Sequence, residues 1–410
     1  MIINKLKKFL KFVEGSIYIV IRGNWLYYLW VSFLMILIGI GVFAYSRQFQ
    51  YGMITTHMRD TVSWAFYIGQ FTFLVGVAAA AVMLVIPAYI YNWKPIKEVV
   101  LFGELLAVSA ILMCLLFVMA DIGHPERFWH MIPGIGHLNF PSSLLSWDCL
   151  VLNFYLFLNL AIVTYLIYKS FFKETPNKKI YLPLVFISIP AAISIHTVTA
   201  FLYNGLPGRP FWNSALLAPR FIASAFCSGP AILVILFQIL RKTTDFDIKD
   251  EAIAKIAELM AYAAVVNLYF FGCEIFKEYY SNTHHLIHFQ FIYKGIHGHN
   301  YIVPYGWMSF FFNVIACVIL LFPKLRKNLL VLNVGCLLLY AGIYIEKGMA
   351  LLIPGFTPGT LGQIYDYFPS LNEIMVSAGI FSAGFLAYTF MVKVAVAVTT
   401  GKFSHENLEK

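Results

Sequence analysis

Ten stretches of apolar residues run through this sequence, and each is long enough to cross a lipid bilayer. A bilayer core of about 30 Å takes roughly 20 residues of α-helix, whose backbone polar groups find their partners within the segment. The composition agrees, because only 12% of the residues are charged, against roughly 25% in soluble domains. The sequence therefore predicts an all-α integral membrane protein with ten transmembrane helices. We expect these helices at residues 25–45, 65–90, 99–120, 146–168, 181–203, 216–240, 257–276, 305–322, 329–346 and 371–396.

The basic residues are distributed unevenly between the loops. With the N-terminus inside, 21 of the 29 lysines and arginines fall on the inner side and eight on the outer side. Inner loops carry this excess, so we expect a multi-pass protein of the cytoplasmic (inner) membrane with both termini in the cytoplasm. The same distribution argues against nucleic-acid binding, despite the net charge of +9. The segment from Lys5 to Lys11 is basic and amphipathic, which favours an interfacial helix. The long outer loops are then 46–64, 121–145, 277–304 and 347–370.

The spacing of the loops repeats along the chain. Helices two to five and helices six to nine each show a short inner loop, a long outer loop and another short inner loop. In each half the second helix is expected to end outside in an acid, Asp121 and Glu274. This rhythm predicts two four-helix bundles in parallel repeat, flanked by helices one and ten. The segments are an amphipathic stretch 1–24, the first helix and its loop 25–60, the two bundles 61–203 and 204–346, and the final loop, helix and tail 347–410.

Metal and haem sites are not indicated by the cysteines and histidines. The six cysteines stand singly, without the spacing of an iron–sulfur or c-type haem motif, so we interpret them as small buried residues. A b-type haem commonly needs two histidines from facing helices, and only His196 lies well inside a span. A loop group is better explained by docking or by solvent exposure than by a metal; it consists of His284, His285, His288, His297 and His299.

Titratable residues gather at the outer face, where ten of the eleven histidines fall. The third span ends in Asp121, and Pro125 can end the helix and hold a turn. His124, Glu126, Arg127 and His130 follow within nine residues. This group could be a functional site, or it could be a plain interfacial cap in which Asp121 pairs with Arg127.

Three further polar residues fall inside the outer ends of spans, where an ionised group normally needs a partner or a wet cavity. Asp148 follows the start of the fourth span. His196 lies seven residues short of the end of the fifth, roughly 10 Å deep at about 1.5 Å per residue, and a hydrogen-bonded structural histidine is the alternative. Arg220 stands one turn into the sixth span and requires a carboxylate or a ligand oxygen. A rigid Gly- and Pro-rich turn that begins at Tyr203 connects these last two spans.

This set of residues favours a quinone site. A quinone ring needs an apolar slot with a hydrogen-bonding group at each carbonyl, and its two-electron chemistry needs groups that exchange protons near neutral pH. Asp121 with Arg127, and His196 with Arg220, could supply these groups. A secondary transporter and a structural anchor without an active quinone site are the competing hypotheses. Four acids could mark a proton path, although polar packing between helices explains them as well; they are Glu104, Glu258, Glu274 and Glu346.

Four motifs resemble the NrfD/polysulfide reductase membrane-subunit (PsrC-like) family. They are Asp-Ile-Gly-His-Pro-Glu-Arg-Phe from residue 121, Pro-Ser-Ser-Leu-Leu-Ser-Trp from 141 and Leu-Pro-Gly-Arg-Pro-Phe-Trp-Asn from 206, with Pro-Arg-Phe-Ile-Ala-Ser-Ala from 219. The likeness runs from about residue 60 to residue 395. The ten-span length points to the long branch of the family, and we expect the closest likeness to be to DsrP, the NrfD-like subunit of the sulfite-reduction-associated DsrMKJOP complex.

The resemblance implies a subunit that has no haem or iron–sulfur cluster of its own and that exchanges electrons with menaquinone or menaquinol near the extracytoplasmic face. It also implies partners, namely a periplasmic ferredoxin-like iron–sulfur subunit, a multihaem cytochrome c, a haem b membrane subunit and a cytoplasmic iron–sulfur catalytic subunit. Some relatives are thought to move protons. A subunit of this kind is not catalytic alone.

The family's functional positions can be matched to this sequence. Asp121 and Arg127 match the acid and the arginine after the third helix. The region of the fifth and sixth helices is matched by His196, Arg209 and Arg220. Gln70 stands where relatives often have an asparagine. The sequence departs from the family at Ala78 and Ala79, where several relatives have a histidine, and at Asp148, where a small residue is usual. The candidate quinone and proton-exchange residues are Asp121, His124, Arg127, Asp148, His196, Tyr203, Arg220 and Gln70.

Overall fold

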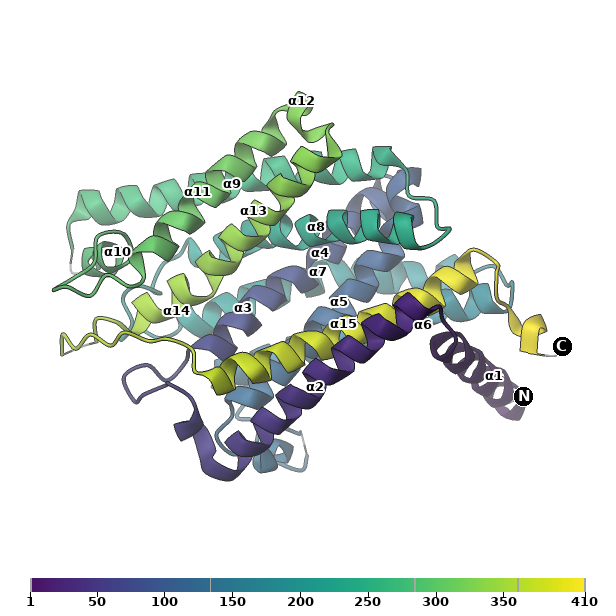
Figure 1. The fold of residues 1–410 in the computed structure, drawn as a ribbon, viewed down its shortest axis with the longest axis horizontal. Coiled ribbons are helices and arrows are strands. Elements are labelled where there is room, and N and C mark those ends of the chain that lie inside the picture. Colours follow the sequence, from purple (N-terminus) through teal and green to yellow (C-terminus); the bar gives the residue numbers. More distant parts are fainter. Residues whose placement is uncertain (1, 133, 284, 360, 409–410) are drawn as a thin grey trace.

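The computed structural model describes residues 2–132, 134–283, 285–359 and 361–408, and within them it confirms the all-α fold with ten membrane-spanning helices (Figure 1). The spanning helices are α2 (Trp25–Tyr51), α3 (Phe66–Ala78) with α4 (Ala80–Val85) and η2 (Ile86–Ile90), α5 (Lys94–Asp121), α6 (Leu144–Phe171), α7 (Lys178–Asn204), α8 (Leu217–Thr243), α9 (Asp250–Ser281), α11 (Val303–Leu321), α13 (Leu329–Lys347) with α14 (Met349–Phe356), and α15 (Leu371–Thr399). The other helices are α1 (Ile2–Ile21), η1 (Gly52–Thr55), which continues the span of α2, η3 (Pro125–Met131), α10 (Leu286–Tyr293), α12 (Pro323–Arg326) and η4 (His405–Leu408).

Several helices extend beyond the predicted apolar stretches. Helix α9 starts at Asp250 and ends at Ser281, because the lysines and glutamates that interrupt its apolar run are good helix formers and acids in its first turn suit the helix dipole. Glu274 therefore lies inside α9, and the prediction that it ends the helix was wrong. Helix α5 starts at Lys94, with a proline in its first turn. Glu104 consequently lies about three turns into the helix.

The predicted helix at 65–90 is interrupted. Its α-helical pattern breaks at Ala79, and the segment Ile86–Ile90, which contains Pro87, forms a π-helical turn. A proline removes one backbone donor and clashes with the preceding turn, which is a common cause of such a break. The break lies where α4 packs on α5 and α8.

The predicted first bundle corresponds to helices α3 to α7, and the predicted second bundle corresponds to helices α8 to α14. In the first bundle α3 packs most extensively on α5, and α6 on α7; in the second, α8 packs on α9 and α13, and α11 on α13. Helix α8 also contacts α3, α4 and α7, so it forms the boundary between the bundles. Helices α3 and α5 are mostly buried, as expected of central helices, whereas α2 is largely exposed.

Helices α2 and α15 form a close pair against α5. Gly41 and Gly379 meet at their crossing, where a Cβ added at Gly41 would lie 2.6 Å from the Gly379 Cα. Small residues that let backbones approach are typical of helix contacts in membranes. The chain begins and ends at one end of the molecule, and α10, α14 and the loop before α3 lie at the other (Figure 1). We call this second end the outer end.

Candidate functional site

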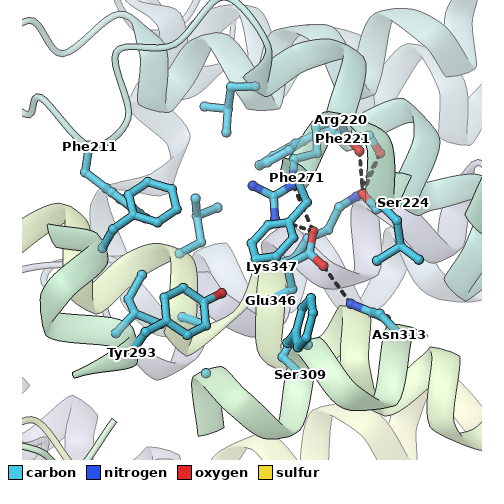
Figure 2. Close-up of a pocket in the computed structure, with 18 residues that line it drawn as sticks. Phe211, Arg220, Phe221, Ser224, Phe271, Tyr293, Ser309, Asn313, Glu346 and Lys347 are labelled. Carbon is cyan, nitrogen blue, oxygen red and sulfur yellow. Dashed lines mark hydrogen bonds and ion pairs between the residues drawn. The ribbon is translucent and has the colours of Figure 1, made fainter. Parts of the chain in front are cut away.

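An ion-pair pocket lies in the outer half of the second bundle. We define it by Arg220 of α8, Glu274 of α9, Asn313 of α11, and Glu346 and Lys347 of α13. Arg220 contacts both acids: Nη1 pairs with Glu274, and Nη2 lies 2.9 Å from Glu346 Oε1. The other oxygen of Glu346 accepts a hydrogen bond of 2.8 Å from Asn313. These contacts confirm that Arg220 requires a carboxylate (Figure 2).

The walls of this pocket are largely aromatic. Phe211, Phe271 and Tyr293 surround the charged groups (Figure 2), and the Arg220 guanidinium lies 5.0 Å from the centre of the Phe271 ring. The cavity between them measures about 50 Å³, which is room for a few water molecules, because one needs about 10–15 Å³. The ion-pair pocket therefore combines balanced buried charge with a small, mostly apolar cavity.

A second polar group, the first-bundle cluster, consists of Thr72, Asp121, Asp148, Thr199 and Tyr203. Thr199 donates to Asp148 Oδ1 at 2.7 Å across the α6–α7 contact. The hydroxyls of Thr72 and Tyr203 hydrogen-bond between α3 and α7. The charges of both aspartates act on the Tyr203 hydroxyl. The structure thus brings Asp121, Asp148 and Tyr203 together in the outer half of the first bundle.

Some buried polar atoms near the first-bundle cluster have no hydrogen-bond partner within the described part of the chain. They are Asp121 Oδ1, both ring nitrogens of His196 and Gln70 Oε1. His196 is only 2% exposed, and the amide nitrogen of Gln70 donates to Tyr344 at 2.5 Å. A buried polar group left unsatisfied costs about 1–3 kcal/mol, so such atoms indicate places where a ligand or water binds.

Lys347 is a functional candidate that the sequence analysis missed, because it was counted among the outer-loop basic residues. Its side chain is 3% exposed, and its Nζ donates to the Phe221 carbonyl at 2.9 Å. It also lies within electrostatic reach of His196. Lys347 therefore borders the ion-pair pocket, and its charge also acts on His196. The available signal was its position next to Glu346 at the end of an apolar run.

Glu373 was also missed. It is fully buried at the start of α15 and accepts hydrogen bonds from the backbone nitrogens of Ser370 at 2.8 Å and His57 at 3.1 Å, and from the Tyr367 hydroxyl. Asp121 lies within electrostatic reach of it. The Ser-Leu-Asn-Glu sequence from Ser370 forms a capping box, and that pattern was the signal available.

The residues that follow Asp121 do not join it. His124 and Arg127 are exposed on the outer surface around η3, and His124 pairs with Glu126 at 2.9 Å. Backbone hydrogen bonding and then the His124 contact hold the pKa of Glu126 below its usual range. In the described ranges no ion pair joins Asp121 and Arg127, so the structure gives the interfacial-cap pairing no support.

The loop histidines are dispersed. His288 is buried and its Nδ1 lies 3.3 Å from the Thr357 carbonyl, while His299 pairs with Asp366 at 2.7 Å. His284 lies outside the described residues. Among those that are described, no three histidines, cysteines or acids are grouped so that they could hold a metal ion.

The remaining predicted acids lie away from the first-bundle cluster. Glu104 is buried in α5, and neither of its oxygens has a partner in the described structure. Glu258 accepts hydrogen bonds from Lys255 at 3.1 Å and from the Tyr262 hydroxyl at 2.8 Å. Arg209, in the turn after α7, stacks over the Phe356 ring at 4.6 Å.

Comparison with known proteins identifies the family. Residues 55–358 match the family described as "Polysulphide reductase, NrfD". The chain is 24% identical to a selenate reductase subunit of Mesobacillus selenatarsenatis, over 93% of this chain and 96% of that protein. It is 23% identical to the Hdr-like menaquinol oxidoreductase integral membrane subunit of Archaeoglobus fulgidus, over 90% and 93%. It is also 23% identical to the menaquinone reductase integral membrane subunit of Nitratidesulfovibrio vulgaris, over 80% and 82%. Because the family match covers well over half of the 410 residues, the chain belongs to the NrfD/polysulphide reductase family.

Proposed function

We propose that this protein is the quinone-interacting membrane subunit of a respiratory redox complex, and that menaquinone or menaquinol binds at the first-bundle cluster near the extracytoplasmic face. Family membership supports the proposal, as do the names of two relatives, a menaquinol oxidoreductase subunit and a menaquinone reductase subunit. The single observation that carries it is the set of unpartnered buried atoms on Asp121 and His196.

These two side chains have the chemistry that a quinone requires. An apolar ring with two oxygens would offer partners to Asp121 Oδ1 and to a nitrogen of His196, which removes the cost of leaving them unsatisfied. When menaquinol is oxidised, its two hydroxyl protons leave together with two electrons. A carboxylate and a neutral imidazole can each accept one proton, and the electrons pass to an iron–sulfur partner. The reverse direction uses the same groups.

The aromatic residues above the first-bundle cluster suit a flat ligand. Trp212 stacks near Trp64 at 6.3 Å between ring centres, and the edges of Tyr203 and Phe356 approach Trp212 at 5.2 and 5.0 Å. Such rings pack well against another aromatic ring while they exclude water. Tyr203 faces this group and also bonds Thr72, so it would position the ring.

The partners and the orientation belong to the same proposal. The outer end, with α10 and α14, faces the periplasm and receives the ferredoxin-like iron–sulfur subunit, and both termini lie in the cytoplasm. The excess of basic residues at the other end supports this orientation. The remaining partners are a multihaem cytochrome c, a haem b membrane subunit and a cytoplasmic iron–sulfur catalytic subunit. Assignment to DsrP and to sulfite reduction rests on the sequence motifs alone.

Proton movement is a further part of the proposal. Lys347 borders the ion-pair pocket and its charge acts on His196, so a proton released at His196 could continue toward Glu346 and Glu274. Glu104, which is buried without a partner, and Glu258 would serve the opposite side of the membrane. One of these acids, Glu346, borders a cavity of about 50 Å³, and water in it would supply the mobile links between side chains.

The test is quinol oxidation by the purified complex. We expect Asp121→Asn and His196→Ala each to lower turnover with a menaquinol analogue at least tenfold, because each removes a proton acceptor. Glu126→Gln and His130→Gln change the same residue types on the exposed outer loop and should leave turnover unchanged. Menaquinone retained by each purified variant is measured by mass spectrometry. Full turnover in both Asp121→Asn and His196→Ala would contradict the proposal and favour a structural anchor.

A further inference from the structure

An open groove lies between α1 and α6 at the end of the molecule that carries both termini. Its volume is about 770 Å³, far larger than the ion-pair pocket. Figure 1 shows α1 projecting beside the bundle at this end. The groove is lined along α6 by Phe157, Leu160, Ala161 and Tyr165, and on the α1 side by Phe9.

Aromatic contacts fix α1 in the position that forms the groove. Phe12 is buried and meets the edges of Tyr168 and Phe171 at 5.6 and 5.5 Å between ring centres. Further along α1, Tyr18 stacks on Phe403 at 5.4 Å. These contacts hold one face of an amphipathic helix against the bundle, in the position typical of a helix at the membrane interface.

Positive charge is in excess at the mouth of the groove. Three lysines line it, Lys5, Lys8 and Lys169, with one acid, Glu174. That acid is shared, because its two oxygens lie 3.1 Å from Lys8 Nζ and 2.5 Å from Lys169 Nζ. Lys5 is exposed and pairs with none of the residues that the structure describes. The mouth of the groove therefore carries a net charge of two positive units.

We propose that this groove binds an anionic phospholipid from the leaflet that surrounds the two termini. Its phosphate would lie among Lys5, Lys8 and Lys169, and one acyl chain would run along Phe157, Leu160 and Ala161 on α6. The charge complementarity selects an anionic head group, since lysine is a common phosphate ligand. The apolar wall selects a lipid over free phosphate. The bound lipid would brace α1 against α6.

Native mass spectrometry of the purified full-length chain tests this proposal. The chain is titrated with dioleoyl phosphatidylglycerol, with dioleoyl phosphatidylcholine and with inorganic phosphate, and the bound lipid is counted. We expect phosphatidylglycerol to bind more tightly than phosphatidylcholine. Each lysine near an anionic head group contributes about a fivefold gain in affinity, so Lys5→Gln with Lys8→Gln should weaken phosphatidylglycerol binding by about 25-fold. Lys94→Gln with Lys97→Gln removes the same charge from exposed positions in the first turn of α5 and should change little.

A second variant tests the apolar wall separately. Ala161→Trp fills the groove without altering its charge, and we expect it to reduce phosphatidylglycerol binding while the chain remains folded. Equal affinity for the two lipids, equal losses in the two lysine pairs, or unchanged binding in Ala161→Trp would each overturn the proposal. Displacement of the lipid by millimolar inorganic phosphate would also overturn it, because the site would then recognise phosphate alone.

Discussion

Replacing Arg220 with methionine tests the energetic role of the ion-pair pocket. Arg220 is the shared partner of Glu274 and Glu346, and all three side chains are at most 15% exposed. The substitution leaves two buried carboxylates without their cation, and breaking a buried pair in this way costs about 3–5 kcal/mol. The neighbouring Lys347 is the one cation left among the residues that define the pocket, and its amine also donates to the Phe221 carbonyl, so it offsets at most one of the two carboxylates.

A compensating variant decides whether lost charge pairing or lost packing causes the instability of Arg220→Met. In Arg220→Met with Glu274→Gln and Glu346→Gln both ion pairs of Arg220 are removed, and Lys347 keeps its hydrogen bond to the Phe221 carbonyl. The glutamine at position 346 can still accept from Asn313. We expect this triple variant to recover most of the loss, because replacing every member of a buried ion pair is often close to neutral. The free energy of unfolding is measured in detergent by titration with sodium dodecyl sulfate, followed by tryptophan fluorescence. A triple variant as unstable as the single one, or a single variant within about 1 kcal/mol of the parent, would refute the reasoning.

Two further predictions concern the outer end and the α2–α15 pair. Burial lowers the pKa of His288, so the unfolded chain takes up a proton first as the pH falls. Stability should therefore decrease below a pH of about 6.5. When melting temperatures at several pH values are compared, this decrease should be smaller in His288→Phe. Gly41→Ala places a methyl group 2.6 Å from the Gly379 Cα and should cost about 1–3 kcal/mol of stability. The control is Gly39→Ala, whose methyl group meets nothing within 4 Å. It should cost nothing measurable in the same unfolding titration. Equal effects of the two alanines would contradict the close helix crossing.

The spans were predictable because bilayer thickness imposes a length and an apolar composition that a sequence displays directly. Where polar residues interrupt the apolar composition, the predicted helix boundaries were wrong. The polar residues within α9 shortened its predicted length, and Glu274 was consequently placed at a helix end. The demand of Arg220 for a carboxylate could be predicted from its depth. The identity of its partners could not, because Glu346 lies 126 residues further along the chain and only the packing of α8 on α13 brings the two together.

The predicted quinone site was only partly assembled by the fold. Asp121, Asp148 and Tyr203 do converge, since α5, α6 and α7 reach the outer end side by side. Arg220 belongs to the other bundle, and Arg127 lies on the surface. Lys347 and Glu373 were overlooked because charged residues near the ends of apolar runs are usually solvated. Whether such a residue turns inward depends on its neighbours, and the sequence pattern does not contain that information.

The position of α8 has a mechanical consequence. Its inner face forms a wall of the ion-pair pocket through Arg220 and Ser224, while its opposite side rests on α3, α4 and α7. Because one helix borders both the ion-pair pocket and the helices of the first bundle, a tilt or shift of α8 changes its contacts on both sides. A displacement of α8 that accompanies ligand binding at the first-bundle cluster would therefore also move Arg220 in the ion-pair pocket. No chain of intermediate contacts is needed.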